Sequence, residues 1–195
     1  MKKVELDLDG VLLDTMSYFC EIYNLLNKTN KTIYDMTRYG FFEDWGETEE
    51  EFWNVFDFCQ LDEIEPLDKK APKYIKKIAE KYRVDIVTAR EEKQRKDIME
   101  CLERIGLIQG IHFTQLKLTL HPLIDSKLDI PYDLYIDDST NLAKLIQNQQ
   151  YHYVYGSRQM LLWQQPWNWN VVSGNGVYRV TGWKDIIKWF KNNNL

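Results

Sequence analysis

Short, largely apolar segments alternate with longer amphipathic segments along most of this chain. The short segments predict β-strands at residues 4–6, 84–87, 111–113, 133–136 and 153–155. The longer segments carry apolar residues at helical spacing and predict helices at residues 73–82, 91–105, 140–147 and 183–191. Strands and helices that alternate in this way are typical of an α/β fold, in which helices cover both faces of a parallel sheet.

The alternation is interrupted after the first predicted strand. Apolar residues at helical spacing predict a helix over residues 16–30, and residues 31–62 then mix acidic with aromatic side chains. Within this stretch Thr48 and Glu51 have the spacing of a capping box, which predicts that a helix begins just after Thr48.

We therefore expect the chain to have two parts. Residues 16–65, called the cap segment below, form a small helical insertion over the functional site, and residues 1–15 and 66–195 form the core. A chain of 195 residues that is 44% hydrophobic is long enough for one domain with such an insertion.

Composition and charge exclude several classes of function and partner. The formal charge of −5 argues against binding along a nucleic-acid backbone, which usually needs a basic face, although a local cation can still bind a small anion. The chain has no apolar run long enough to cross a membrane, so we expect no membrane partner. Its three cysteines, Cys20, Cys59 and Cys101, are scattered, which favours a reducing, cytoplasmic location.

The first strand ends in a pair of carboxylates. Asp7 and Asp9 lie two positions apart, so in extended backbone both side chains project to the same side, while Leu8 points back to the core. Each carboxylate resists ionising beside the other unless a cation lies between them, and Mg²⁺ prefers such oxygen ligands. A carboxylate can also attack phosphorus. The alternative is a strand end followed by an Asx turn.

Two other predicted strands also end in polar residues. Thr88 follows one of them, Asp137 and Asp138 follow another, and Lys127 precedes the latter. Since ligands bind at the carboxyl ends of parallel strands, these groups should meet and form a site able to bind phosphate. Taken singly, Thr88 is an ordinary strand end, Lys127 a surface lysine and Asp138 a helix cap, but such explanations would have to coincide at every position.

The order of these motifs resembles the haloacid dehalogenase (HAD) superfamily of phosphatases. The matching segments are residues 7–11, residues 86–88, Lys127 and residues 134–138. The resemblance implies a HAD-like parallel sheet with a small helical cap inserted after the first strand. We expect that fold here.

A narrower resemblance, over most of the chain, is to the 5′(3′)-deoxyribonucleotidases. It rests on residues 64–67, on Lys127 ten residues before Asp137, and on residues 165–168 and 179–183. The sequence departs from the mammalian members where Ala89-Arg90 replaces Ser-Pro and where Trp167 and Trp169 occur in the tail. These departures concern the substrate more than the chemistry.

The resemblance also implies catalytic roles. Asp7 is the nucleophile that takes the phosphoryl group, and Asp9 protonates the leaving alcohol and then deprotonates the attacking water. Thr88 donates a hydrogen bond to the phosphoryl oxygens, and Lys127 neutralises charge on Asp7 and the phosphate.

The implied cofactor is Mg²⁺. Its expected ligands are a carboxylate oxygen of Asp7, the backbone carbonyl of Asp9 and the carboxylate of Asp138. Asp137 is expected to bind the ion through water or to orient the site.

Substrate contacts are expected from the cap segment and from Arg90, just after Thr88. The aromatic residues Phe41, Phe42 and Trp45, with Tyr39 nearby, are candidates for stacking on a nucleobase. For any one of them, packing inside the cap segment is the more common role. Arg90 either touches the leaving group or pairs with Asp9. Glu5, inside the first strand, indicates a sheet edge or a solvated face.

The leading hypothesis is a Mg²⁺-dependent phosphomonoesterase for (deoxy)ribonucleoside monophosphates that forms an aspartyl-phosphate intermediate. The alternatives are a phosphatase or phosphotransferase for another small metabolite, a nucleic-acid 3′-phosphatase, and a catalytically silent protein that binds phosphate or a nucleotide. The expected partner is a small phosphomonoester. The assembly state stays open, with a homodimer as one alternative.

Overall fold

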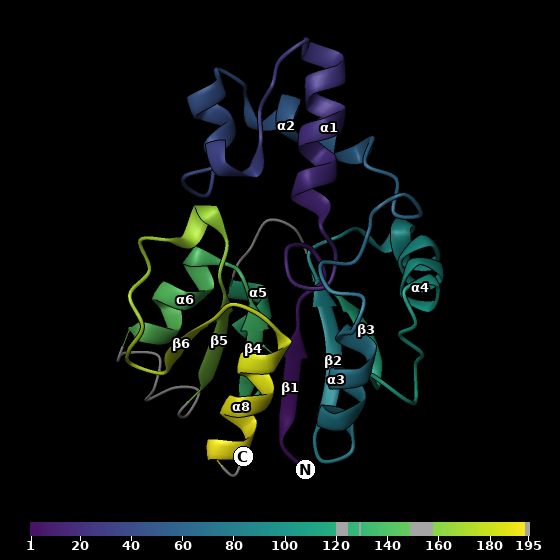
Figure 1. Cartoon of the computed structure of the whole chain (residues 1–195), viewed down its shortest axis with the longest axis vertical. Coiled ribbons are helices and arrows are strands. Elements are labelled where there is room, and N and C mark those ends of the chain that lie inside the picture. The colour runs from purple at the N-terminus through teal and green to yellow at the C-terminus, as the bar shows by residue number, and fades with distance from the viewer. Residues whose placement is uncertain (120–124, 129, 149–157, 194–195) are drawn as a thin grey trace.

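A six-stranded parallel sheet forms the centre of the molecule (Figure 1). The computed structural model describes residues 1–119, 125–128, 130–148 and 158–193. The strand order is β3-β2-β1-β4-β5-β6, so β1 lies in the middle. The strands are β1 (Lys3–Leu6), β2 (Arg83–Thr88), β3 (Gln115–Leu118), β4 (Leu134–Asp137), β5 (Gln159–Trp163) and β6 (Val177–Val180).

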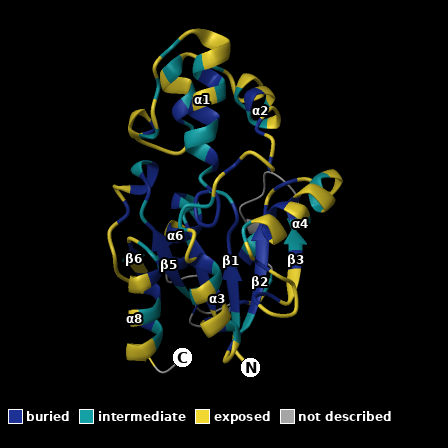
Figure 2. Ribbon diagram, turned by 45° about the vertical axis from the view of Figure 1, so that its right-hand side comes forward, coloured by how far each residue is buried: buried dark blue, intermediate teal, exposed yellow. Residues whose placement is uncertain are grey.

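Helices cover both faces of this sheet, as the alternating pattern predicted (Figure 1). On one face α3 (Ala71–Ala79), α4 (Arg95–Arg104) and α8 (Trp183–Asn193) pack on apolar strand residues such as Leu6 and Ile86. On the other face α5 (Asp125–Leu128) and α6 (Thr140–Gln147) pack on residues such as Met160. Burial on both faces explains why the inner strands are almost wholly buried (Figure 2). The α/β fold class is confirmed.

The insertion after β1 lies beyond the carboxyl ends of the strands (Figure 1). It contains α1 (Thr15–Asn27), the 3₁₀ helices η1 (Ile33–Asp35) and η2 (Phe41–Trp45), and α2 (Glu49–Asp57). The capping box at the start of α2 is confirmed. The Thr48 hydroxyl accepts the Glu51 N–H at 3.2 Å, and the Glu51 carboxylate accepts the Thr48 N–H at 2.7 Å.

One predicted strand is absent from the structure, and another lies outside the described residues. The strand expected at residues 111–113 is wrong, because the chain turns there and β3 begins only at Gln115. Gly110 has a left-handed φ of +83°, and the His112 N–H bonds the carbonyl of Ile108 at 2.9 Å, so the apolar residues pack as a turn. The strand expected at 153–155 lies outside the described residues. The sequence pattern assigned no strand to β5 or β6.

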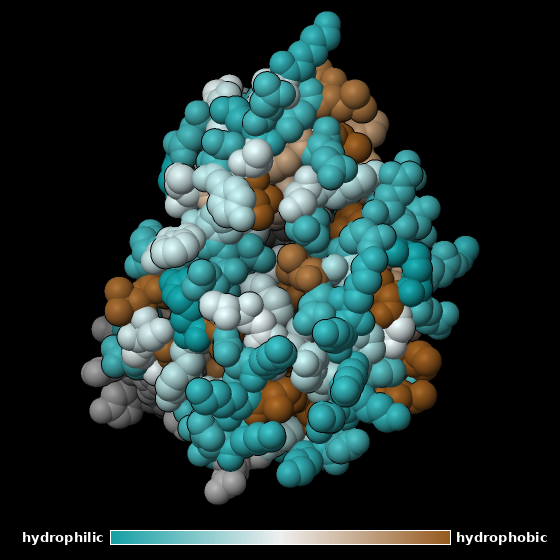
Figure 3. Space-filling view, viewed as in Figure 1, coloured by the Kyte–Doolittle hydropathy of each residue, from teal (hydrophilic) through white to brown (hydrophobic). Residues whose placement is uncertain are grey.

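The surface is mostly hydrophilic on the face shown in Figure 3, with hydrophobic atoms in separate groups. Among the described residues, no helix combines the length and apolar character that crossing a membrane would require.

Candidate active site

The loop after β1 fixes the first two candidate carboxylates. The backbone N–H of Asp7 continues the sheet by donating to the carbonyl of Ile136 at 3.0 Å. The chain then turns sharply at Gly10, whose φ is +79°, and the N–H groups of Leu12 and Leu13 both bond the carbonyl of Leu8. Leu8 itself is fully buried, as expected for a side chain that points away from the site.

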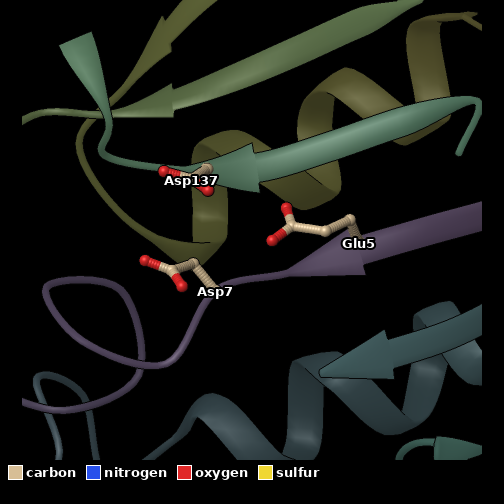
Figure 4. A group of neighbouring side chains, drawn as sticks. All are labelled: Glu5, Asp7 and Asp137. Carbon is tan, nitrogen blue, oxygen red and sulfur yellow. The ribbon is translucent and has the colours of Figure 1, made fainter. Parts of the chain in front are cut away.

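Lys127 lies at the centre of a buried acidic group. Its ammonium donates to Asp137 Oδ2 at 2.6 Å, to Asp7 Oδ1 at 2.8 Å and to Glu5 Oε1 at 3.2 Å. Figure 4 shows the three side chains near one another, Glu5 on β1, Asp7 just past the end of β1 and Asp137 at the end of β4. Burial by itself lowers the pKa of Lys127, but the three carboxylates raise it well above its ordinary value, so the lysine stays charged.

Glu5 is the site residue whose role the sequence did not indicate. Instead of marking an edge or a solvated face, it lies in the central strand, fully buried, with Asp85 and Tyr135 as its neighbours in the sheet. Its Oε2 atom has no hydrogen-bond partner in the described part of the chain. Burial raises its pKa well above the ordinary value. A glutamate in an otherwise apolar inner strand was the one available signal.

Asp7 is poised between two protonation states. Burial, followed by the negative charge of Asp137, raises its pKa, and Lys127 lowers it; the net result is a pKa of about 7. A carboxylate with this pKa is ionised in a large share of molecules at neutral pH, and a nearby cation would ionise it fully. It can therefore act as a nucleophile.

The carboxylate of Asp9 accepts hydrogen bonds from two side chains, those of Arg90 and Thr15. Arg90 donates from Nη2 to Oδ1 at 2.8 Å and from Nε to Oδ2 at 2.9 Å, and the Thr15 hydroxyl donates to Oδ1 at 2.6 Å. Burial raises the pKa of Asp9, but Arg90 and Thr15 outweigh it and bring the pKa below its ordinary value. Of the two roles open for Arg90, pairing with Asp9 is therefore present in the structure.

Asp138 lies among charges of its own sign. A Cβ atom on Gly10 would be 2.2 Å from its Oδ2, so its carboxylate lies directly over the β1 loop. Burial and then the charges of Asp7 and Asp137 raise its pKa well above the ordinary value, against the opposing effect of Lys127. Such a group favours either a proton or a further cation beside it.

Three carboxylates lie close enough together to hold a metal ion, those of Glu5, Asp7 and Asp137, but the ammonium of Lys127 already bonds all three. Asp137 Oδ1 also accepts the Ser139 N–H at 2.7 Å. Asp138 is not a member of this group, although the charges of Asp7 and Asp137 raise its pKa.

Thr88 ends β2, as the sequence predicted. Its side chain is almost fully buried, and its hydroxyl oxygen accepts the Arg90 N–H at 3.3 Å. The Thr119 N–H and hydroxyl both donate to its carbonyl, at 2.9 and 3.2 Å, which fixes the strand end. Because the hydroxyl oxygen acts as an acceptor in that bond, its hydrogen remains available to donate.

The loop after β5 contains residues that hold the two acidic loops together. Gln165 donates from Nε2 to the carbonyl of Gly10 at 2.7 Å, and Asn168 donates from Nδ2 to the carbonyl of Asp138 at 2.9 Å. Arg179 on β6 donates to Asn168 Oδ1 at 2.9 Å. In the sequence analysis these residues formed part of the family resemblance only, because their spacing alone does not indicate a structural role.

The candidate base-stacking residues pack largely on one another. Phe41 is buried, with ring centroids 4.7 Å from Trp45 and 5.7 Å from Phe52, and Phe42 lies 5.2 Å from Phe52. Tyr39, in contrast, is 56% exposed, and its pKa is raised by partial burial and by the carboxylates of Asp138, Asp137 and Asp7. Since such effects weaken with distance, the Tyr39 phenol lies within electrostatic range of these carboxylates.

The solved structures that share this fold include HAD-type hydrolases. A predicted phosphatase from Clostridium acetobutylicum has 15% identity and a TM-score of 0.63, and covers 98% of each chain. A predicted phosphoglycolate phosphatase from Haemophilus somnus has 17% identity and a TM-score of 0.59, and covers 97% of each chain. A HAD family hydrolase from Deinococcus radiodurans has 14% identity and a TM-score of 0.59, and covers 100% of this chain and 97% of that one. The fold is that of the HAD superfamily.

The family of the chain follows from the match of its sequence to a known protein family. Residues 2–192 match the family described as 5′ nucleotidase, deoxy (pyrimidine), cytosolic type C protein (NT5C). No curated protein matches the chain. The chain belongs to this nucleotidase family and is a phosphatase-type hydrolase, which confirms both resemblances inferred from the motifs.

Proposed function

We propose that this protein is a Mg²⁺-dependent phosphomonoesterase that hydrolyses (deoxy)ribonucleoside monophosphates through an aspartyl-phosphate on Asp7. The observation that carries the proposal is that Asp7, with a pKa of about 7, bonds the Lys127 ammonium and lies close enough to Asp138 to raise its pKa. A nucleophilic carboxylate flanked by a fixed cation and a second cation site suits phosphoryl transfer.

The residues present fit a magnesium ion. Asp138 has a raised pKa among like charges, which a divalent cation would relieve, and its carboxylate fits only because residue 10 lacks a side chain. Carboxylates of Asp7 and Asp138 and the backbone carbonyl of Asp9 are the proposed ligands, with Asp137 orienting the site. The ion would neutralise phosphoryl oxygens and lower the proton affinity of Asp7. The Deinococcus radiodurans hydrolase was solved with phosphate and sodium, which supports a combined anion and cation site.

The first half-reaction transfers the phosphoryl group. An oxygen of Asp7 forms a bond to phosphorus while the ester P–O bond breaks, and its electron pair goes to the leaving oxygen. Asp9 gives that oxygen a proton; the negative charge of a bound phosphate favours the protonated form of Asp9 beforehand. In the second half-reaction Asp9 takes a proton from water, which attacks phosphorus and releases Asp7 and phosphate.

Two further residues stabilise the transferred group. The Thr88 hydroxyl, which keeps its hydrogen available, donates to a phosphoryl oxygen, and Lys127 offsets the charge that develops there. Glu5 and Asp137 fix the Lys127 ammonium from its other sides. These donors are in place before substrate arrives, so little reorganisation is needed in the transition state.

We propose that residues 16–65 act as a cap over the core of residues 1–15 and 66–195 and confer the preference for nucleotides. Family membership supports a nucleotide substrate. Contact of Phe41, Phe42 and Trp45 with the base stays a prediction, and Tyr39 joins them because it is exposed and within electrostatic range of the acidic site. The family description supports a cytosolic location. A homodimer also stays a prediction, which light scattering after gel filtration would test.

Phosphate release from a substrate panel tests this proposal. The panel contains 5′ and 3′ (deoxy)nucleoside monophosphates and sugar phosphates, each assayed with Mg²⁺, with EDTA and with the Asp7→Asn variant. We expect Mg²⁺-dependent turnover of nucleotides that the variant lacks. Turnover of sugar phosphates alone would keep the mechanism and reject the substrate, and no turnover would favour a silent binding protein.

A further inference from the structure

We propose that Arg90 is a positioning residue that couples the cap segment to the acid–base carboxylate of Asp9. The inference rests on the proposed function and extends it by assigning a task to a residue for which the sequence left two roles open. Arg90 itself is almost fully buried.

One side of the Arg90 guanidinium donates two hydrogen bonds to the Asp9 carboxylate. Nε and Nη2 of Arg90 donate to the two different oxygens of Asp9, at 2.9 and 2.8 Å. A two-point contact of this kind fixes the plane of the carboxylate as well as its position. The Thr15 hydroxyl adds a third bond, at 2.6 Å to Oδ1. Asp9 therefore has its orientation set by Arg90 and Thr15 together.

The two residues that bond Asp9, Arg90 and Thr15, are each connected to a helix of the cap segment. The guanidinium carbon of Arg90 lies 4.9 Å from the ring centroid of Phe56, in α2. Thr15 is the first residue of α1, where the chain enters the cap segment. Both groups that hold Asp9 are thus attached to the helices of the cap segment. A shift of those helices would move the carboxylate, and a correctly seated cap would align it.

The third guanidinium nitrogen takes no part in these contacts. Nη1 of Arg90 is buried without a hydrogen-bond partner in the part of the chain that the structure describes. The position of the guanidinium is therefore set by its contacts with Asp9 and Phe56.

The proposed task has a chemical signature. When a nucleoside leaves, its oxygen needs the proton of Asp9, because an alkoxide is a poor leaving group. When p-nitrophenolate leaves, it is stable as an anion and needs no proton. A misplaced Asp9 should therefore slow the first substrate far more than the second. An Arg90 that bound the phosphate directly would instead affect both substrates equally.

The test compares kcat/KM for a deoxynucleoside 5′-monophosphate and for p-nitrophenyl phosphate in the full-length protein with Mg²⁺. This ratio reports the steps up to phosphoryl transfer, so the later attack of water does not enter. The variants are Arg90→Gln, Arg90→Lys and Phe56→Leu. The control is Arg83→Gln, which removes an arginine that pairs with the buried Asp85 at the other end of β2.

We expect Arg90→Gln to lower kcat/KM for the nucleotide at least about tenfold more than for p-nitrophenyl phosphate, within the range of general acid catalysis. Arg90→Lys should recover part of the loss, Phe56→Leu should show a smaller loss in the same direction, and Arg83→Gln should change neither. Equal losses on both substrates, or none, in Arg90→Gln and Phe56→Leu would overturn the proposal. If Arg90→Gln fails to fold, Phe56→Leu decides. A wild-type protein that hydrolyses neither substrate would instead refute the proposed function.

Discussion

The Oδ2 atom of Asp138 lies 2.2 Å from the point that a Cβ atom on Gly10 would occupy. The loops after β1 and β4 therefore approach each other so closely that a side chain at residue 10 and the carboxylate of Asp138 exclude one another. Glycine is favoured at residue 10 for a second reason, because its φ of +79° is one that other residues rarely adopt.

Substitution Gly10→Ala should abolish Mg²⁺-dependent turnover by displacing the carboxylate of Asp138. Strain at the positive φ adds a loss of about 1–2 kcal/mol in the free energy of unfolding. Gly110→Ala is the matched control, because Gly110 has a φ of +83° and open space around its Cβ position. It should show the loss of stability with full activity. Equal activity in the two variants would contradict the steric argument.

Asp138→Asn should stabilise the metal-free protein while abolishing its response to Mg²⁺. Burial and the charges of Asp7 and Asp137 raise the pKa of the Asp138 carboxyl group, so its ionised form is unfavourable in the folded state. Asparagine does not ionise, and the variant therefore avoids this unfavourable charge. Thermal unfolding with EDTA and with Mg²⁺ measures both effects. A variant that unfolds at a lower temperature in EDTA but still gains stability from Mg²⁺ would show that Asp138 is not a ligand.

The metal-free protein should lose stability as the pH rises from about 4 to about 7. The pKa of Asp7 is raised from 3.8 to about 7, so between these values the folded state binds a proton that the unfolded state has released. Stability from this group therefore falls with pH in that window and is constant above it. Mg²⁺ competes with the proton, so its stabilising effect should grow with pH. Asp7→Asn removes this contribution; an unchanged pH profile in the variant would contradict the assignment.

Asn168→Ala should weaken Mg²⁺ binding without touching a proposed ligand. Asn168 bonds the carbonyls of Asp138 and Trp163, at 2.9 and 2.8 Å, and accepts from Arg179, so the variant leaves buried groups unpaired. We expect a loss of about 2–3 kcal/mol in the free energy of unfolding. We also expect a higher Mg²⁺ concentration at half-maximal turnover. An unchanged Mg²⁺ requirement would make the role of Asn168 purely structural.

Local patterns predicted much of the fold. The alternation of apolar and amphipathic segments gave the parallel sheet, and Thr48 with Glu51 gave the start of α2, because such signals depend on near neighbours in sequence. The pattern failed at residues 111–113, where the same apolar residues fill a turn closed by backbone bonds. Periodicity alone does not distinguish a short buried turn from a strand.

Part of the candidate site could be predicted from where the strands end. Asp7, Thr88 and Asp138 lie at or just after strand ends, and the topology of a parallel sheet predicts that such residues meet. The contacts of the structure join Asp7 and Asp137 through Lys127. The burial of Glu5 beside Lys127 did not follow, because it depends on which strand lies in the middle of the sheet. The bonds from Gln165 and Asn168 depend on contacts between segments far apart in sequence.

In the proposed mechanism Asp7 carries the phosphoryl group during turnover. This intermediate can be detected by acid-quenching the protein during turnover of a deoxynucleoside monophosphate with Mg²⁺, followed by mass spectrometry of the peptide that contains residue 7. We predict the added mass of one phosphoryl group on Asp7 in the wild type, and none in Asp7→Asn, which should also be inactive. Turnover by Asp7→Asn at the wild-type rate, or a phosphoryl group on another residue, would contradict the account.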